Sequence, residues 1–177
     1  MIKSKNGQVW IETVLYTVIG LALIGLVLAF VTPKINETKD RVVVEQTIDS
    51  LNKLDEKLNI GSGNTRNVDF TIKRGSLTIY TTEDLLVFTL DDLSKPYSEP
   101  NISIPFGNIK LISQEGQKYS SASMTLNYSG KLNITYKGRD DVTQKFNPAS
   151  TPYRFLINNN GAQGGFYVIN IEEISGR

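Results

Sequence analysis

The chain has 177 residues, no cysteine, no histidine and a formal net charge of +1. This length allows one domain plus an appendage, and the lack of cysteine excludes a disulfide framework and thiolate metal sites. Without histidine, the chain lacks the commonest metal ligand and the commonest general base at neutral pH. We therefore expect a non-enzymatic protein without metal or other cofactor, and a charge near zero gives no reason to expect nucleic acid as a partner.

A short basic tail, residues 1–7, precedes a long apolar run. No charged residue occurs between Glu12 and Lys34. A helix over residues 13–33 is about 31 Å long at about 1.5 Å per residue, which is enough to cross a bilayer core of about 30 Å. An ordinary secretory signal has an apolar region of about 7 to 15 residues and a cleavage site of small residues, and this run fits neither property.

The basic residues that flank the run do not determine its orientation in a membrane. Lys3 and Lys5 precede it, and Lys34, Lys39 and Arg41 follow it, so the positive-inside rule is ambiguous. We place the N-terminal tail in the cytoplasm because the large domain that follows has the character of an exported one.

The most specific motif of the chain surrounds a glycine. It combines a basic stretch ending in that glycine, a glutamine, a glutamate and an apolar run: Lys5-Asn6-Gly7, Gln8, Glu12 and residues 13–32. This motif resembles the N-terminus of the type IV pilin superfamily. Gln8 followed four residues later by Glu12 is most similar to the archaeal branch, although Trp10 stands where that branch has serine. The resemblance implies that a membrane prepilin peptidase cuts between Gly7 and Gln8 and removes residues 1–7 as a class III signal peptide.

The resemblance also implies an assembly role for Glu12. Cleavage would create a free amine at Gln8, one helical turn away, and in pilins such a carboxylate pairs with the amine of a neighbouring subunit. An ionised carboxylate at the bilayer centre costs about 2.5 to 3.5 kcal/mol, and less near the interface, so such residues usually have a partner. The alternative is a glutamate that lies in the headgroup layer without a role.

Three small residues share one face of the apolar run. Ala22, Gly25 and Ala29 follow a spacing of three and then four residues, with Thr32 nearby. Small residues allow helix backbones to approach closely in lipid or in a filament core. Glycine and alanine are also frequent in membrane helices in general, so the spacing alone does not distinguish the two explanations.

The helix is expected to continue beyond Pro33, where a kink is predicted, as an amphipathic segment over residues 34–60. An apolar stripe at helical period faces a charged stripe: Val44, Thr47, Ile48, Leu51, Leu54 and Leu58 against Glu45, Asp49, Lys53 and Glu56. Residues 61–64, rich in glycine, are expected to end the helix.

Residues 65–177 predict a β-rich extracellular head. Strands are expected at residues 68–73, 77–81, 85–90, 108–113, 123–128, 131–137, 153–157 and 166–171. Ser129 and Gly130 predict a two-residue hairpin, and three prolines make residues 94–105 a loop or an edge segment. The predicted fold class is α+β: a long N-terminal helix, hydrophobic over residues 8–33 and then amphipathic, packed on an antiparallel β-sandwich-like head.

The head contains few candidates for binding chemistry. Residues 158–165, rich in Asn and Gly, could bind a phosphate or a glycan, but they lack the ending of a phosphate loop and are interpreted as a hairpin tip. Residues 91–92 and 140–141 are Asp pairs without the spacing of a calcium loop, so solvated turns are expected. Sequons at Asn36, Asn101, Asn127 and Asn133 are candidate glycosylation sites, in a number close to chance.

The sequence favours a subunit of an extracellular type IV pilus-like filament. The resemblance implies copies of the chain, the prepilin peptidase, the membrane assembly machinery and, before assembly, membrane lipid as partners. It does not separate an adhesion pilus, an archaellum and a secretion pseudopilus. The main alternative is a signal-anchored surface protein whose β-rich head binds a ligand and does not polymerise. A secreted enzyme or lectin is a further alternative, although no pair of catalytic carboxylates stands out.

Overall fold

The computed structural model describes residues 5–59 and 61–174, with side chains from Val9 onward. The predicted leader lies largely outside this part, because residues 1–4 are not described. The chain divides into two units, Met1–Lys39 and Asp40–Arg177, each of which is described by itself.

Helix α1, Lys5–Leu58, is a continuous helix of 54 residues with Pro33 inside it. Proline has no backbone N–H, so the carbonyl of Ala29 loses its helical donor, but the helix does not end there. Neighbouring hydroxyls bond within the helix, as Thr32 Oγ1 does to the carbonyl of Leu28 over 2.7 Å. The predicted continuation beyond Pro33 is thus confirmed, and the helix ends at Leu58, before the glycine-rich residues 61–64.

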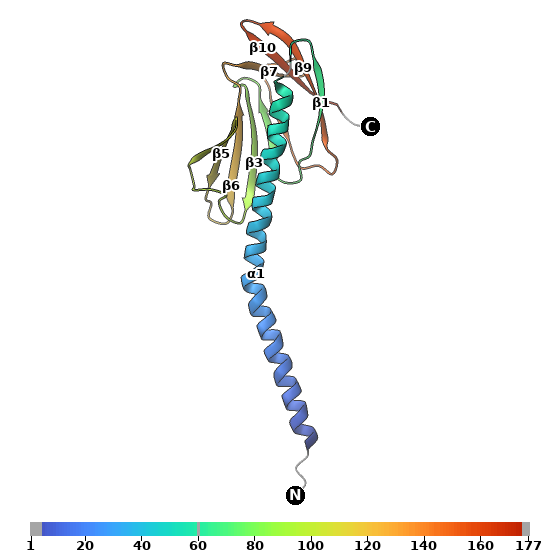
Figure 1. Ribbon diagram of the computed structural model, residues 1–177, viewed down its shortest axis with the longest axis vertical. Helices are drawn as coiled ribbons and strands as arrows, with labels where there is room; N and C mark the ends of the chain where they lie inside the picture. Colours follow the sequence, from blue (N-terminus) through green and yellow to red (C-terminus); the bar gives the residue numbers. More distant parts are fainter. Residues whose placement is uncertain (1–4, 60, 175–177) are drawn as a thin grey trace. The chain divides into compact units, whose positions relative to one another are not determined.

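The head contains two β-sheets (Figure 1). The four-stranded sheet has the order β1 (Thr65–Phe70), β9 (Tyr153–Gln163), β10 (Phe166–Glu173) and β7 (Leu132–Tyr136). The six-stranded sheet has the order β4 (Ser103–Phe106), β5 (Ile109–Gln114), β6 (Ser120–Asn127), β3 (Leu85–Leu93), β2 (Ser76–Tyr80) and β8 (Thr143–Phe146). All pairs of these strands are antiparallel except β7 with β10, which is parallel, so the head is antiparallel-rich.

The core of the head joins both sheets to the second half of α1. The predicted stripe from Val44 to Leu58 is buried and belongs to one hydrophobic cluster with both sheets, while the opposite charged stripe is exposed. Phe146 of the six-stranded sheet and Phe155 of the four-stranded sheet meet edge to face, with ring centroids 5.0 Å apart. The expected fold class, a long apolar helix packed on a β-rich head, is therefore confirmed.

The predicted hairpin at Ser129 and Gly130 is wrong, because β6 and β7 belong to different sheets. The chain instead coils after β6: the amides of Lys131 and Leu132 both donate to the carbonyl of Tyr128, over 2.8 and 3.0 Å. The alternation of apolar residues in β7 fits either sheet, so the local pattern does not specify the partner strand.

Several strands also differ from the prediction, such as β1, which covers Thr65–Phe70 where residues 68–73 were expected. β8 was not predicted, and residues 158–163 extend β9, so that the hairpin turn is confined to Gly164 and Gly165. The proline-rich residues 94–105 end in β4, which contains Pro105 and forms an edge of the six-stranded sheet. An edge strand is where proline is tolerated, since its missing N–H faces no partner strand.

Candidate functional site

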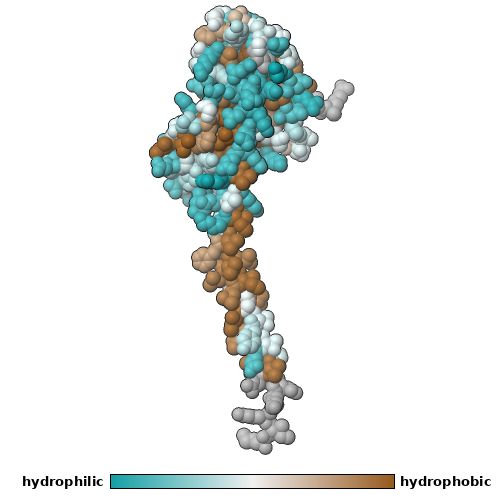
Figure 2. All heavy atoms as spheres, in the orientation of Figure 1, coloured by the Kyte–Doolittle hydropathy of each residue, from teal (hydrophilic) through white to brown (hydrophobic). Residues whose placement is uncertain are grey.

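The apolar first half of α1 is the most unusual surface among the described residues. Its large apolar side chains, from Val9 to Ile35, are each between 42% and 72% exposed. Figure 2 shows this part of the helix largely brown next to the head and interrupted by white and teal side chains toward its N-terminal end. Soluble monomers rarely expose apolar patches larger than a few hundred Å², and a helix that is apolar all round is normally covered. By length and composition, this helix could cross a membrane or serve as a signal sequence.

Glu12 is the one charged residue of this surface between residues 9 and 33. It is exposed, and none of the ion pairs among the described residues includes it. The neighbouring hydroxyls of Thr13 and Thr17 are satisfied within the helix, because they donate to carbonyls four residues earlier over 2.9 and 2.8 Å. Gly7 and Gln8 lie in α1, but their side chains are outside the described part, so the cleavage prediction stays a prediction.

The predicted small face, Ala22, Gly25 and Ala29, is exposed along its length. A Cβ atom added at Gly25 would meet no described atom within 4 Å. No contact within the described chain therefore requires glycine at this position.

The four sequons differ in accessibility. Asn36 on α1, Asn101 before β4 and Asn127 at the end of β6 are exposed, while Asn133 on β7 is half-buried. The side-chain oxygen of Asn127 accepts a hydrogen bond from the amide of Ser129 over 2.9 Å. This bond does not use the side-chain nitrogen. The structure thus makes Asn133 the least accessible acceptor for a glycan.

Three of the other candidates from the sequence are engaged in contacts within the head. Asp92 pairs with Arg74 over 2.8 Å and Asp141 pairs with Arg139 over 3.1 Å. Asn158 accepts a hydrogen bond from Thr65 Oγ1 over 2.7 Å. Within the described residues, no group of three or more Asp and Glu side chains could hold a metal ion.

The sequence did not reveal a polar network at the start of the packed half of α1. Arg74 Nη1 donates to Asp40 Oδ1 over 2.7 Å, and the amide of Ser94 donates to Asp40 Oδ2 over 2.7 Å. Burial acts to raise the pKa of the Asp40 carboxyl, but the hydrogen bonds from Ser94 and the charge of Arg74 outweigh it and hold the pKa below its ordinary value. The signal was present in the sequence, because Asp40 lies four residues before Val44 and hence on the buried stripe.

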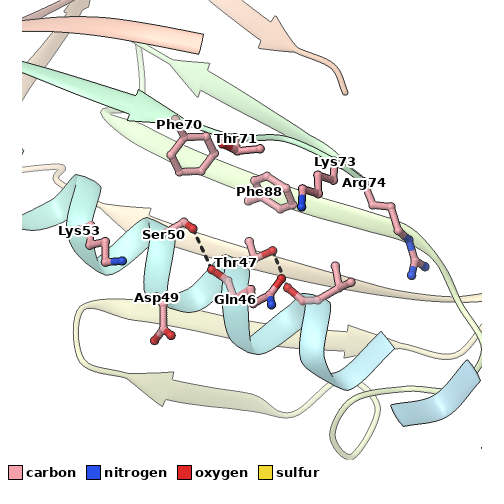
Figure 3. Close-up of a pocket in the computed structure, with 11 residues that line it drawn as sticks. Gln46, Thr47, Asp49, Ser50, Lys53, Phe70, Thr71, Lys73, Arg74 and Phe88 are labelled. Carbon is pink, nitrogen blue, oxygen red and sulfur yellow. Dashed lines mark hydrogen bonds between the residues drawn. The ribbon is translucent and has the colours of Figure 1, made fainter. Parts of the chain in front are cut away.

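A groove of about 340 Å³ lies beside α1 in the head, and the sequence did not predict it. Six of its lining residues define its two sides: Gln46, Ser50 and Lys53 on α1, and Phe70, Lys73 and Phe88 opposite. In Figure 3 the two aromatic rings face the turns of the helix that carry Gln46 and Ser50. Both sides of the groove carry polar groups, and Phe70 and Phe88, which are each 2% exposed, contribute little of its surface.

In comparisons with known proteins, no family model matches the chain, and neither a curated protein nor a solved structure shows significant similarity to it.

Proposed function

We propose that the chain is a structural subunit of an extracellular type IV pilus-like filament, cut by a prepilin peptidase after Gly7 and assembled through α1. The observation that supports this most is the exposed apolar half of α1, which carries the single carboxylate of Glu12. The same helix continues without a loop into the core of a β-rich head.

The position of Glu12 favours a filament over a permanent anchor. A lipid anchor gains nothing from a carboxylate at the edge of its span, where the cost of the charge is below the roughly 2.5 to 3.5 kcal/mol of the bilayer centre. In a filament, the amine that cleavage creates at Gln8 supplies the opposite charge in an apolar environment. The apolar side chains of α1 then gain about 25 cal/mol for each Å² that neighbouring helices cover.

In this proposal lipid covers the first half of α1 in the precursor, with the head outside the cell. The assembly machinery extracts the cut subunit, and copies of the chain replace the lipid around the helix. An exposed glycine on the helix, Gly25, fits close approach of a neighbouring backbone. Adhesion, motility and secretion filaments all use such a subunit, and the proposal does not choose among them.

Intact mass or N-terminal sequencing of the protein from cells tests the processing step. The proposal expects loss of residues 1–7 and an N-terminus at Gln8. A chain that retains Met1 would support the alternative, a signal-anchored surface protein whose head does not polymerise.

A further inference from the structure

We propose that a depression at the edge of the four-stranded sheet binds a neutral carbohydrate. The depression lies between the loop that follows α1 and strand β9, and its volume is about 380 Å³. It is lined by Ser62, Gly63, Asn64, Thr65 and the three asparagines at residues 158–160. This inference goes beyond the proposed function, because the assembly of a filament does not require a ligand on the head.

Backbone hydrogen bonds hold the two walls of the depression together. The amide of Gly63 donates to the carbonyl of Asn159 over 2.9 Å, and the amide of Asn159 donates to the carbonyl of Asn64 over 3.0 Å. These bonds continue the antiparallel pairing of β1 with β9, in which Thr65 lies opposite Asn158. The walls are therefore ordered without a ligand, so that little conformational entropy is lost on binding.

Several polar groups of the lining have no hydrogen-bond partner among the described residues. Asn158 accepts a bond from Thr65 Oγ1 over 2.7 Å with its side-chain oxygen, which leaves both N–H groups of its side-chain amide available. No side-chain hydrogen bond within the described part of the chain includes Ser62, Asn64 or Asn160, and all three residues are exposed. Because a side-chain amide supplies both donors and an acceptor, the lining can donate to and accept from the same ligand.

The lack of charge in the lining selects the class of ligand. None of its residues is ionisable. A phosphate, a sulfate or a uronic acid is bound most strongly where a cation pairs with it, and this lining has no cation. A sugar hydroxyl donates one hydrogen bond and accepts others, which matches a surface of amides and hydroxyls. The chemistry of the depression therefore favours a neutral carbohydrate over an anionic ligand.

The depression lies at the end of the head that is remote from Asp40, the first residue of the head unit. Within the head, α1 continues from Asp40 to Leu58, which is about 27 Å at about 1.5 Å per residue. The loop that forms one wall of the depression follows this end of the helix. A carbohydrate in the depression therefore binds far from the residues that join the head to the apolar half of α1.

Saturation-transfer NMR of the full-length chain tests binding, in a detergent whose headgroup is not a sugar. The neutral probes are maltotriose, mannotriose, cellotriose and chitotriose, and the acidic probe is trigalacturonic acid. We expect saturation transfer to at least one neutral probe and none to the acidic probe. A chain that binds none of the neutral probes, or that binds the acidic one alone, would overturn the proposal.

Alanine variants test whether the ligand occupies the depression. Asn64→Ala and Asn160→Ala should each weaken binding about 2- to 10-fold, the effect of one lost hydrogen bond. Both variants should unfold at the wild-type temperature, because neither side chain has a hydrogen bond within the described head. Asn147→Ala is the matched control, since this exposed asparagine lies outside the depression, and its affinity should stay unchanged.

Affinities of Asn64→Ala and Asn160→Ala equal to that of the wild type would place the carbohydrate elsewhere and overturn this site. None of these measurements depends on cleavage after Gly7 or on filament formation. Failure of the carbohydrate site therefore leaves the proposed function standing, whereas a chain that retains Met1 in cells contradicts the proposed function alone.

Discussion

Tyr128 Oη donates a hydrogen bond of 2.6 Å to Asp55 Oδ1, which ties the buried face of α1 to the end of β6. The second carboxylate oxygen accepts from Asn108 Nδ2 over 2.7 Å. Burial first, then the hydrogen bond to Asp55 and last the charge of Asp55 raise the pKa of the Tyr128 hydroxyl, so it remains a donor at all physiological pH values. The last turns of the helix are thus fixed to the six-stranded sheet by a carboxylate as well as by leucines.

Removing the hydroxyl of Tyr128 should destabilise the head. Tyr128→Phe leaves a buried carboxylate oxygen of Asp55 without this partner, and the expected loss in the free energy of unfolding is about 1 to 3 kcal/mol. Urea denaturation of the full-length chain in detergent, followed by tyrosine fluorescence, measures it. Tyr119→Phe is the control, because Tyr119 is 52% exposed. Equal unfolding midpoints for the two variants would contradict a structural role for the bond.

The Asp40 network predicts a pH dependence of stability at low pH. The pKa of Asp40 lies below its ordinary value of 3.8 in the folded head, so the folded state binds fewer protons than the unfolded state in that range. The contribution of Asp40 is therefore fully present above the ordinary pKa and is lost as the pH falls through the lowered one. Stability differences between the wild type and Asp40→Asn, measured from pH 7 to pH 2, should shrink below about pH 4. A stability difference between the two proteins that is constant from pH 7 to pH 2 would contradict a lowered pKa of Asp40.

Two glycines with positive φ allow the cost of backbone strain to be compared with the cost of steric crowding. Gly75 has a φ of 78°, and a Cβ atom there would lie 2.3 Å from the carbonyl oxygen of Thr89. Gly130 has a φ of 72°, but an added Cβ meets no described atom within 4 Å. Gly75→Ala should thus cost at least about 2 kcal/mol of unfolding free energy, against about 1 kcal/mol for Gly130→Ala. Thermal unfolding measures both variants. Equal losses of unfolding free energy would contradict a cost of steric crowding at Gly75.

Much of the fold follows from local patterns, whereas pairings between distant residues do not. The stripe from Val44 to Leu58 repeats at helical period, so both the helix and its buried face were predictable. β7 alternates equally well for either sheet, and its place is fixed by distant groups: its Ile134 amide donates to Asp84 Oδ1 over 2.7 Å. Such contacts over 50 positions leave no periodic signal in the sequence.

The candidate site was also only partly predictable from the sequence. The apolar run and the position of Glu12 are features of the sequence, and the structure adds that the run forms one helix with exposed apolar side chains. The groove joins α1 to residues from β1, β3 and the loop after β1, so only the folded chain reveals it.

Replacement of Glu12 tests the assembly role within the span. Glu12→Ala should leave the head folded and the leader cleaved, and should reduce surface filaments severely because the amine of a neighbouring subunit loses its partner. Glu12→Asp keeps the charge and should retain part of the assembly. Quantitative immunoblots of sheared filaments and of membranes measure both fractions. Normal filaments from the Glu12→Ala variant would remove this role.

The most direct measurement is electron microscopy of filaments sheared from cells, combined with mass spectrometry of their subunits. The account predicts filaments composed of this chain, with Gln8 as the first residue of every copy and the first half of α1 inside the filament. A chain found only as an uncut, single molecule in the membrane fraction, and absent from every surface filament, would contradict it.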